Sequence, residues 1–111
     1  QNLPGLLLEA LAGLLNDKEA IVRCSASKAL GKISQRQDLP GPSLEALVDL
    51  LDDTDEVCRS AAKALEVIAE RCDIPDNVVA QAVAIWKKNG AVAVRLLLRI
   101  LYRRGVSLPP A

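Results

Sequence analysis

Few side chains in this sequence could catalyse a reaction. Histidine is absent, so neither a Ser/His nor a Cys/His pair can form, and no phosphate-binding glycine loop occurs. The three cysteines, Cys24, Cys58 and Cys72, are odd in number and never spaced as CxxC, which argues against a disulfide framework or a zinc site. We therefore expect free thiols in a reducing, cytoplasmic setting, with no cofactor, no metal and no enzymatic activity.

An acidic cluster is the first group that could still carry chemistry. It contains Asp52, Asp53, Asp55 and Glu56, and carboxylates at close spacing can bind a cation or act as an acid–base pair. The cluster lacks the glycine turn and the twelfth-position glutamate of a calcium loop. Acids of a turn and of a helix N-terminus explain it better.

Cys58 is the candidate nucleophile. It lies beside Arg59 near the start of a predicted helix, and a neighbouring cation lowers the pKa of a thiol. No base accompanies the cysteine, however, so a structural role is favoured over a catalytic one.

A repeated stretch organises the chain. Residues 57–68 repeat residues 22–33, with Val, Ser, Ala, Lys, Ala, Leu and Ile at the same positions, 35 residues apart. Its apolar members lie at i, i+4, i+7, i+8 and i+11, on one face of a helix: Val57, Ala61, Ala64, Leu65 and Ile68. A helix face repeated at this period is typical of a solenoid, in which each unit buries its apolar face against the next.

Four apolar-Pro pairs, at intervals of 36, 35 and 34 residues, mark the unit boundaries: Leu3-Pro4, Leu39-Pro40, Ile74-Pro75 and Leu108-Pro109. Proline suits the first turn of a helix, so each pair can begin one. We predict one domain over residues 1–111, cut from a longer protein. Its parts are repeat 1 at 3–38, repeat 2 at 39–73, a diverged repeat 3 or C-terminal cap at 74–107, and a tail at 108–111.

Each repeat is expected to contain two helices. Their approximate bounds are 4–15, 19–35, 43–51, 55–71, 74–88 and 91–104. Asp17, Thr54 or Asp53, and Asp73 are the expected N-caps, because short polar side chains accept hydrogen bonds from free amides. Asn89 followed by Gly90 indicates a C-cap.

The second helix of each repeat carries a predicted basic face. On the helix at 55–71, the face away from the core reads Arg59, Lys63, Glu66 and Glu70. The equivalent positions hold Cys24, Lys28, Gly31 and Gln35 in the first repeat, and Arg95, Arg99 and Tyr102 in the third. Stacking would create a basic ridge of Lys28, Arg59, Lys63, Arg95 and Arg99, with Tyr102 at its edge. The alternative is a solvated face, on which Arg59 pairs with Glu56 and Lys63 with Glu66.

The charge distribution bears on the partner. Net charge is zero, but residues 1–73 hold 8 Lys/Arg against 13 Asp/Glu, and residues 74–111 hold 6 against 1. An acidic protein surface suits the ridge, because arginine binds carboxylates in bidentate fashion. Zero net charge and scarce aromatics argue against nucleic acid, and Trp86 is expected to pack between helices. No apolar run reaches membrane-spanning length.

This pattern resembles a HEAT-type repeat. The resemblance rests on Leu14-Leu15-Asn16-Asp17, Val22-Arg23, Ala26, Ala29-Leu30 and Ile33, and on Leu50-Leu51-Asp52-Asp53, Val57, Ala61-Ala62, Ala64-Leu65 and Ile68. It covers residues 3–73 well and residues 74–107 only by period. It implies a right-handed all-α solenoid of three antiparallel helix pairs, with the second helices on a protein-binding side. An armadillo-like fold is the alternative, but a third helix per repeat is missing.

The resemblance also implies a repeat ladder, in which Asp17 and Asp53 hold the inter-helix aspartate position and Arg23 the arginine that bonds the next repeat. Cys58 replaces this arginine in repeat 2, where Arg59 could substitute. The implied function is a non-enzymatic protein-interaction scaffold within a larger multidomain protein. The alternatives are a bilin-lyase-like protein holding a tetrapyrrole, a sensor or spacer segment of a NACHT/STAND-type NTPase, and a purely structural cap.

Overall fold

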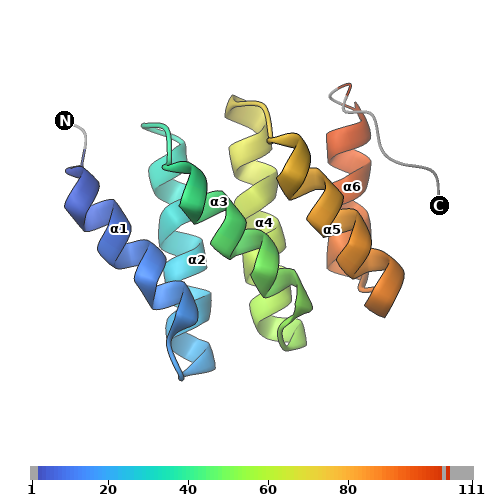
Figure 1. The fold of residues 1–111 in the computed structure, drawn as a ribbon, viewed down its shortest axis with the longest axis horizontal. Helices are drawn as coiled ribbons and strands as arrows, with labels where there is room; N and C mark the ends of the chain where they lie inside the picture. The colour runs from blue at the N-terminus through green and yellow to red at the C-terminus, as the bar shows by residue number, and fades with distance from the viewer. Residues whose placement is uncertain (1–2, 104, 106–111) are drawn as a thin grey trace.

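The computed structural model describes residues 3–103 and 105, and its regular elements are all helices (Figure 1). They are α1 Gly5–Gly13, η1 Leu14–Asn16, α2 Ala20–Ser34, α3 Gly41–Asp49, η2 Leu50–Asp52, α4 Asp55–Arg71, α5 Asp76–Asn89 and α6 Val92–Arg103. The predicted end of the last helix at Arg104 and the predicted tail at 108–111 lie outside the described residues.

The helices form two layers (Figure 1). The first helices α1, α3 and α5 lie in one layer, and the second helices α2, α4 and α6 lie side by side in the other. Each first helix runs antiparallel to the second helix that follows it, which gives a first pair (α1–α2), a second pair (α3–α4) and a third pair (α5–α6). The predicted all-α solenoid of helix pairs is confirmed.

A proline precedes each helix of the first layer. Pro4, Pro40 and Pro75 occupy the N-cap positions of α1, α3 and α5, with φ of −62°, −59° and −58°. Their carbonyls accept hydrogen bonds from the first helical turn, so the fixed φ of proline sets each entry angle. The predicted N-cap Asp73 is therefore wrong, because Pro75 holds that position. At the other end of α5, Gly90 adopts the left-handed φ of 63° that a C-cap requires, as predicted.

The aspartates of the turns orient the backbone before the helix begins. Asp17 accepts a hydrogen bond from the Glu19 amide at 2.9 Å, and Glu19 rather than Asp17 is the N-cap of α2. Asp53 accepts one from the Thr54 amide at 2.7 Å, and Thr54 is the N-cap of α4 without a side-chain capping bond. Neither α2 nor α4 therefore has a side-chain capping bond from its N-cap residue. Instead, an aspartate in the preceding turn accepts a hydrogen bond from the amide of that residue.

The first two helices of the first layer end differently from the prediction. The continuous helices expected at 4–15 and 43–51 instead tighten into the 3₁₀ turns η1 and η2. Such tightening is common at helix C-termini. In both turns the second leucine, Leu15 or Leu51, is fully buried, so the tighter turn still serves the core.

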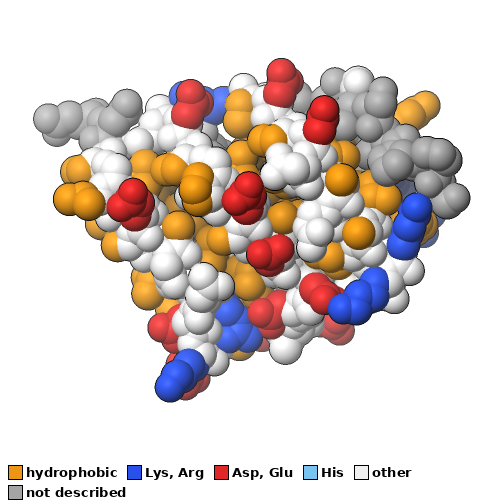
Figure 2. Space-filling view, viewed as in Figure 1, with side chains coloured by type: hydrophobic (Ala, Val, Ile, Leu, Met, Phe, Trp, Pro, Cys, Tyr) orange, Lys and Arg blue, Asp and Glu red, His pale blue; other side chains and the backbone are white. Residues whose placement is uncertain are grey.

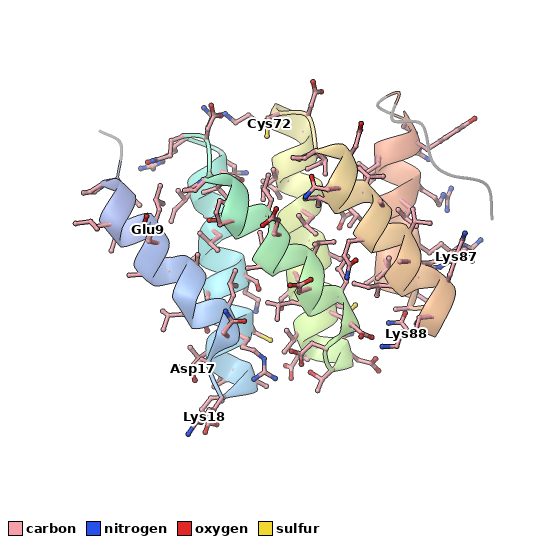
Figure 3. All side chains as sticks on the ribbon, viewed as in Figure 1. Glu9, Asp17, Lys18, Cys72, Lys87 and Lys88 are labelled. Atoms are coloured by element: carbon pink, nitrogen blue, oxygen red, sulfur yellow. The ribbon has the colours of Figure 1, made fainter. Side chains whose placement is uncertain are left out.

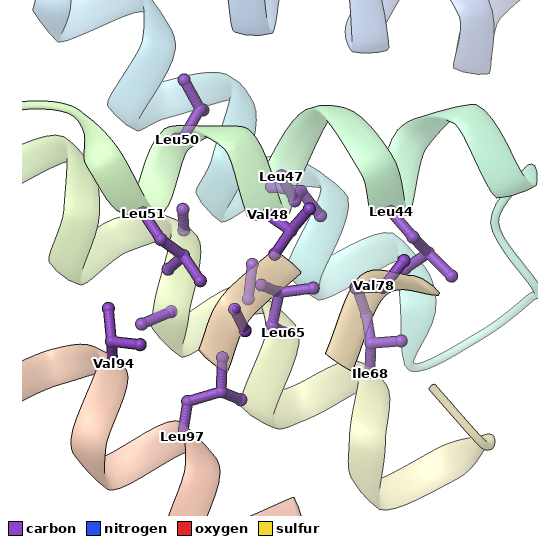
Figure 4. Close-up of a cluster of buried hydrophobic side chains, with 14 of the residues drawn as sticks. Leu44, Leu47, Val48, Leu50, Leu51, Leu65, Ile68, Val78, Val94 and Leu97 are labelled. Carbon is purple, nitrogen blue, oxygen red and sulfur yellow. The ribbon is translucent and has the colours of Figure 1, made fainter. Parts of the chain in front are cut away.

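Helix α4 is the centre of the core. It packs against α2 on one side and α6 on the other, and its repeated apolar face is buried, as predicted. Figure 4 shows Leu65 and Ile68 of this face among side chains from α3, η2, α5 and α6, such as Leu47, Leu51 and Leu97.

Small residues set the distance between α2 and α4. A Cβ atom added at Gly31 would lie 3.2 Å from the Cα of Ala64 and 3.3 Å from its Cβ. The two backbones therefore approach as closely as a glycine–alanine contact permits. Gly31 and Cys24, which the sequence placed on the outward face of α2, are buried for this reason.

The outer side of the first pair exposes apolar positions that the second pair buries. Leu14 is 41% exposed, whereas Leu50, its equivalent 36 residues later, is 6% exposed. Leu7 is likewise 44% exposed, while the equivalent Ser43 is 1% exposed. The second pair is covered at these positions by the first pair, and no described element covers the first.

Substitution of Gly31 should test the close contact. We expect Gly31→Leu to lower the free energy of unfolding by about 1–3 kcal/mol, because the new side chain would force α2 and α4 apart. Gly13→Leu is the matched control, since an added Cβ there meets no atom within 4 Å; we expect a change within about 0.5 kcal/mol. Urea unfolding followed by circular dichroism measures both, and equal losses would contradict the contact.

Candidate functional site

Arg23 joins the first pair to the second. Its Nη2 donates to Oδ1 of Asp53 at 3.0 Å, and its Nη1 donates to the backbone carbonyls of Asp17 and Lys18 at 2.8 and 3.1 Å. Its buried Nε has no hydrogen-bond partner among the described residues. The guanidinium therefore fastens the turn of its own pair to the turn of the next.

The link from the second pair to the third uses another cation. Lys88 of α5 donates from Nζ to Oδ2 of Asp52 at 2.8 Å, and the amide of Asn89 donates to Oδ1 of Asp52 at 3.4 Å. Arg59, the expected substitute for the missing arginine, forms no such bond and points to solvent instead. Figure 3 shows Asp17, Lys18 and Lys88 at the same end of the stack, where both links lie.

The pKa values of Asp53 and Asp52 are both lowered, but by different neighbouring groups. Burial tends to raise the pKa of Asp53, but hydrogen bonds from Arg23 and from the Thr54 amide outweigh it and hold that pKa below its ordinary value of 3.8. The hydrogen bond from Lys88 lowers the pKa of Asp52, which is the more exposed of the two. Two of the four acids of the cluster, Asp52 and Asp53, thus bind cationic side chains of adjacent pairs and have a role within the fold.

Cys58 does not have the environment of a nucleophile. The residue is 3% exposed, and burial together with the charge of Asp55 raises the pKa of its thiol, despite the opposing effect of Arg59. A thiol with a raised pKa stays protonated at neutral pH and is a poor nucleophile. The geometry supports the structural role of this cysteine.

The basic ridge lies on the second-helix layer. All five of its cations are exposed, and they come from three adjacent helices: Lys28 from α2, Arg59 and Lys63 from α4, and Arg95 and Arg99 from α6. The three ion pairs found in the part of the chain that the structure describes involve none of them. The alternative pairs, Arg59–Glu56 and Lys63–Glu66, are not among those three.

The opposite face has another character. Figure 2 looks onto the layer of first helices, where acidic side chains lie across the centre of the face and Lys and Arg side chains gather near its lower and right-hand edges. The two layers therefore present different charge patterns to a partner.

Two grooves accompany the ridge. The first, about 320 Å³, lies between α2 and α4, where Lys28 and Lys63 flank a floor formed by Gly31 and Ala64. The second, about 600 Å³, lies at the last pair and is lined by Trp86, Arg95, Leu98, Arg99, Tyr102 and Arg103. The structure thus brings Arg95, Arg99 and Tyr102 together in one groove and places Lys28 and Lys63 in the other.

Glu66 and Glu70 continue the same face of α4 beyond Lys63 and lie beside the ridge. Glu66 is half-buried, and burial raises the pKa of its carboxyl, an effect opposed by Lys63 and reinforced by Glu70. A partner that follows the ridge from α2 to α6 therefore crosses α4 at Arg59 and Lys63, with the negative charge of Glu66 and Glu70 to one side.

The sequence prediction missed three lining residues of the larger groove, namely Leu98, Arg103 and the aromatic Trp86. Trp86 was expected only as inter-helix packing, and it does pack on the core while half-buried, but its ring also lines the larger groove. One signal could have found it: the chain's single tryptophan and single tyrosine both fall in the third pair, close to its arginines.

The comparison with protein families identifies the repeat. The model for HEAT repeats matches residues 6–66, which is more than half of the chain. The chain belongs to the HEAT-repeat family. HEAT repeats are commonly protein-interaction scaffolds and are generally non-enzymatic. Neither curated proteins nor solved structures gave a match.

The third pair lies beyond the matched residues. It continues the solenoid by geometry, because α6 packs against α4 in the same layer in which α4 packs against α2. Within the described residues, no helix is both long and apolar enough to cross a membrane.

The Arg23–Asp53 link should make stability depend on pH. Because the pKa of Asp53 is lowered by folding, its contribution is fully present above the unfolded value near 3.8 and is lost as pH falls through the folded value. We expect Arg23→Gln to cost about 1–2 kcal/mol at pH 7 and progressively less below pH 4.

Arg36→Gln is the control for this experiment, because Arg36 is exposed and its side chain forms no hydrogen bond or ion pair with the described residues. Urea unfolding at a series of pH values measures both variants. A loss in Arg23→Gln that does not change as pH falls would contradict a contribution from the ion pair with Asp53 and would leave packing and the bonds to the Asp17 and Lys18 carbonyls as its cause.

Proposed function

We propose that this chain is a non-enzymatic protein-interaction module that binds an acidic surface of a partner protein through the basic ridge. The ridge residues are Lys28, Arg59, Lys63, Arg95 and Arg99, with Tyr102 at the edge. The observation that carries the proposal is the placement of five exposed cations on three adjacent helices, outside every ion pair of the described residues.

The cations that fasten the stack contrast with those of the ridge. Arg23, Arg71 and Lys88 each bond an aspartate of another helix pair or of the connection before it, and so act within the fold. The ridge cations have no comparable structural partner. Charges held on a rigid helical layer can be matched by carboxylates of a partner, which favours arginine-rich contacts and fast association.

Acidic protein is a better partner for this surface than nucleic acid. A phosphate backbone running along the ridge would pass Glu66 and Glu70 on α4, and like charges repel. A protein partner can place carboxylates over the ridge and neutral or basic groups beside it, near Glu66 and Glu70. The zero net charge of the chain agrees with this choice.

The proposed setting is a cytoplasmic, larger protein in which further repeats or domains adjoin this one. No disulfide joins the three cysteines in the described part of the chain, which suits a reducing compartment. The exposed apolar positions of the first pair, such as Leu7 and Leu14, suit contact with a preceding repeat. The proposed limits are repeat 1 at 3–38, repeat 2 at 39–73, and repeat 3 or a cap at 74–107.

A structural capping role for the third pair is the second candidate. One observation favours it: Tyr102 holds the position equivalent to Gly31, where the first pair admits the helix of the next pair. A tyrosine there prevents an equally close approach. A cap with an arginine-rich outer side would keep the end of the solenoid solvated.

Charge reversal of the ridge tests the interaction role. We expect affinity capture from a lysate of the source organism to retain a partner on the parent chain and to lose it on the variant Lys63→Glu/Arg95→Glu/Arg99→Glu. The reason is that three attractive contacts to carboxylates become repulsive. Captured proteins are compared by mass spectrometry, and circular dichroism checks that both chains are folded.

The matched control is Lys18→Glu/Arg36→Glu/Lys87→Glu, which changes net charge by the same amount at exposed positions off the ridge. It should retain the partner. If the ridge variant and the control capture the same proteins as the parent, the ridge is a solvated surface and the capping role takes its place.

A further inference from the structure

The two aromatic side chains of this protein meet at one groove. Trp86 comes from α5 and Tyr102 from α6, and they are the chain's only tryptophan and tyrosine in a sequence without phenylalanine. Leu98 lies with them, and three arginines complete the lining: Arg95, Arg99 and Arg103. We call this the aromatic groove.

Three residues that line the aromatic groove have equivalents in the first pair that form a surface for helix packing. The residues 71 positions before Trp86, Leu98 and Tyr102 are Leu15, Ser27 and Gly31, and all three are buried. Gly31 lies against Ala64 of the next pair. In the first pair this side is therefore a flat stacking surface built from small and apolar residues.

The third pair has a different surface at the same place. Tyr102 is 70% exposed, and a helix could not approach it as closely as α4 approaches Gly31. The substitutions turn a helix-stacking side into a hollow of about 600 Å³, which is within the range of pockets that hold small ligands or single side chains. Tryptophan, tyrosine and arginine are also the residues that most often dominate binding energy in protein interfaces.

The lining specifies the chemistry of the occupant. Its floor and walls include the apolar surfaces of Trp86, Leu98 and Tyr102, which suit an aliphatic side chain. Its cations are arginines, and no carboxylate lies among the lining residues that the structure describes, so an anionic flank is favoured. A peptide segment with an apolar residue between carboxylates satisfies both conditions.

We infer that the aromatic groove anchors an acidic peptide segment of the partner protein, with an aliphatic side chain between Trp86 and Tyr102 and flanking carboxylates on Arg95, Arg99 and Arg103. This inference rests on the proposed interaction function and names the segment that the last pair would hold. Stacked nucleotide bases are the rival occupant, because aromatics with arginines also bind single strands. A phosphate chain carries a negative charge at every nucleotide as it continues past the groove towards Glu66 and Glu70 on the adjacent α4, whereas a short peptide can hold its carboxylates at the arginines alone, which favours the peptide.

Fluorescence of the single tryptophan gives a direct test. The probe is the acetylated and amidated peptide Glu-Asp-Leu-Leu-Asp-Glu, titrated into the 111-residue chain. We expect a saturable change in Trp86 emission, because the occupant would exclude water from the indole. Two matched peptides, one with serines in place of the leucines and one with lysines in place of the acids, should bind at least tenfold more weakly.

Variants locate the site on the protein. We expect Tyr102→Ala and Arg99→Gln each to weaken binding of the acidic leucine peptide at least fivefold, by isothermal titration calorimetry. Arg36→Gln is the matched control for Arg99→Gln, because Arg36 is exposed just after α2 and belongs to neither the ridge nor the described lining of the aromatic groove. It should bind like the parent. Thermal unfolding of each variant verifies that the fold is retained, which the high exposure of Tyr102 favours.

The outcomes separate the groove from the ridge. Binding that survives Tyr102→Ala but is lost in Lys63→Glu would overturn the groove and leave the ridge as the binding surface. No binding of the acidic leucine peptide would also overturn the groove, while the ridge is decided separately by the capture experiment. Tighter binding of a twelve-nucleotide oligothymidylate than of the peptide would overturn the acidic-peptide occupant and the proposed protein partner together.

Discussion

The close approach of α2 and α4 is the contact on which the rest of this structure depends. An added methyl group at Gly31 would lie 3.2 Å from the backbone of Ala64, so the two helices are as near as their residues allow. Helix α4 is covered on its other side by α6, which leaves its alanine-rich faces almost without solvent contact. Since the chain has few large side chains to fill gaps, close backbones take the place of bulky packing.

This spacing determines where charge can go. Where Gly31 of α2 meets Ala64 of α4 there is room only for small residues, and the charged side chains of these helices lie at the ends and on the outer face of the layer. At the turn end, Arg23 and Lys88 bond aspartates of the neighbouring pair and fix the rotation between pairs. On the outer face, the ridge cations remain in solvent. Arg23 and Lys88 therefore stabilise the fold, whereas the cations of the ridge are exposed on the outer face.

The last pair departs from this rule, and the departure creates its candidate site. Tyr102 stands where the first pair has glycine, and Trp86 stands where it has leucine. The side of the solenoid that elsewhere receives another helix becomes a hollow with aromatic walls and an arginine rim. Because solenoid units contact only their neighbours, such a change at one end leaves the core of the other pairs intact.

The sequence alone determined the repeat, the helix pairs and the buried face of α4. Helical periodicity and proline positions are local properties of the sequence. The spacing of Val57, Ala61 and Leu65 places all three on one face of a helix, and that apolar face must be buried. The N-caps were less predictable, because Asp17 and Asp73 compete with neighbouring residues for the same role. Only the tertiary structure showed that Cys24 and Gly31 are buried. It also showed that Lys88, and not Arg59, forms the ion pair with the second pair, and that Trp86 and Tyr102 line one groove. These outcomes depend on how far apart two helices lie and how they are rotated, which is decided by contacts between residues distant in the chain.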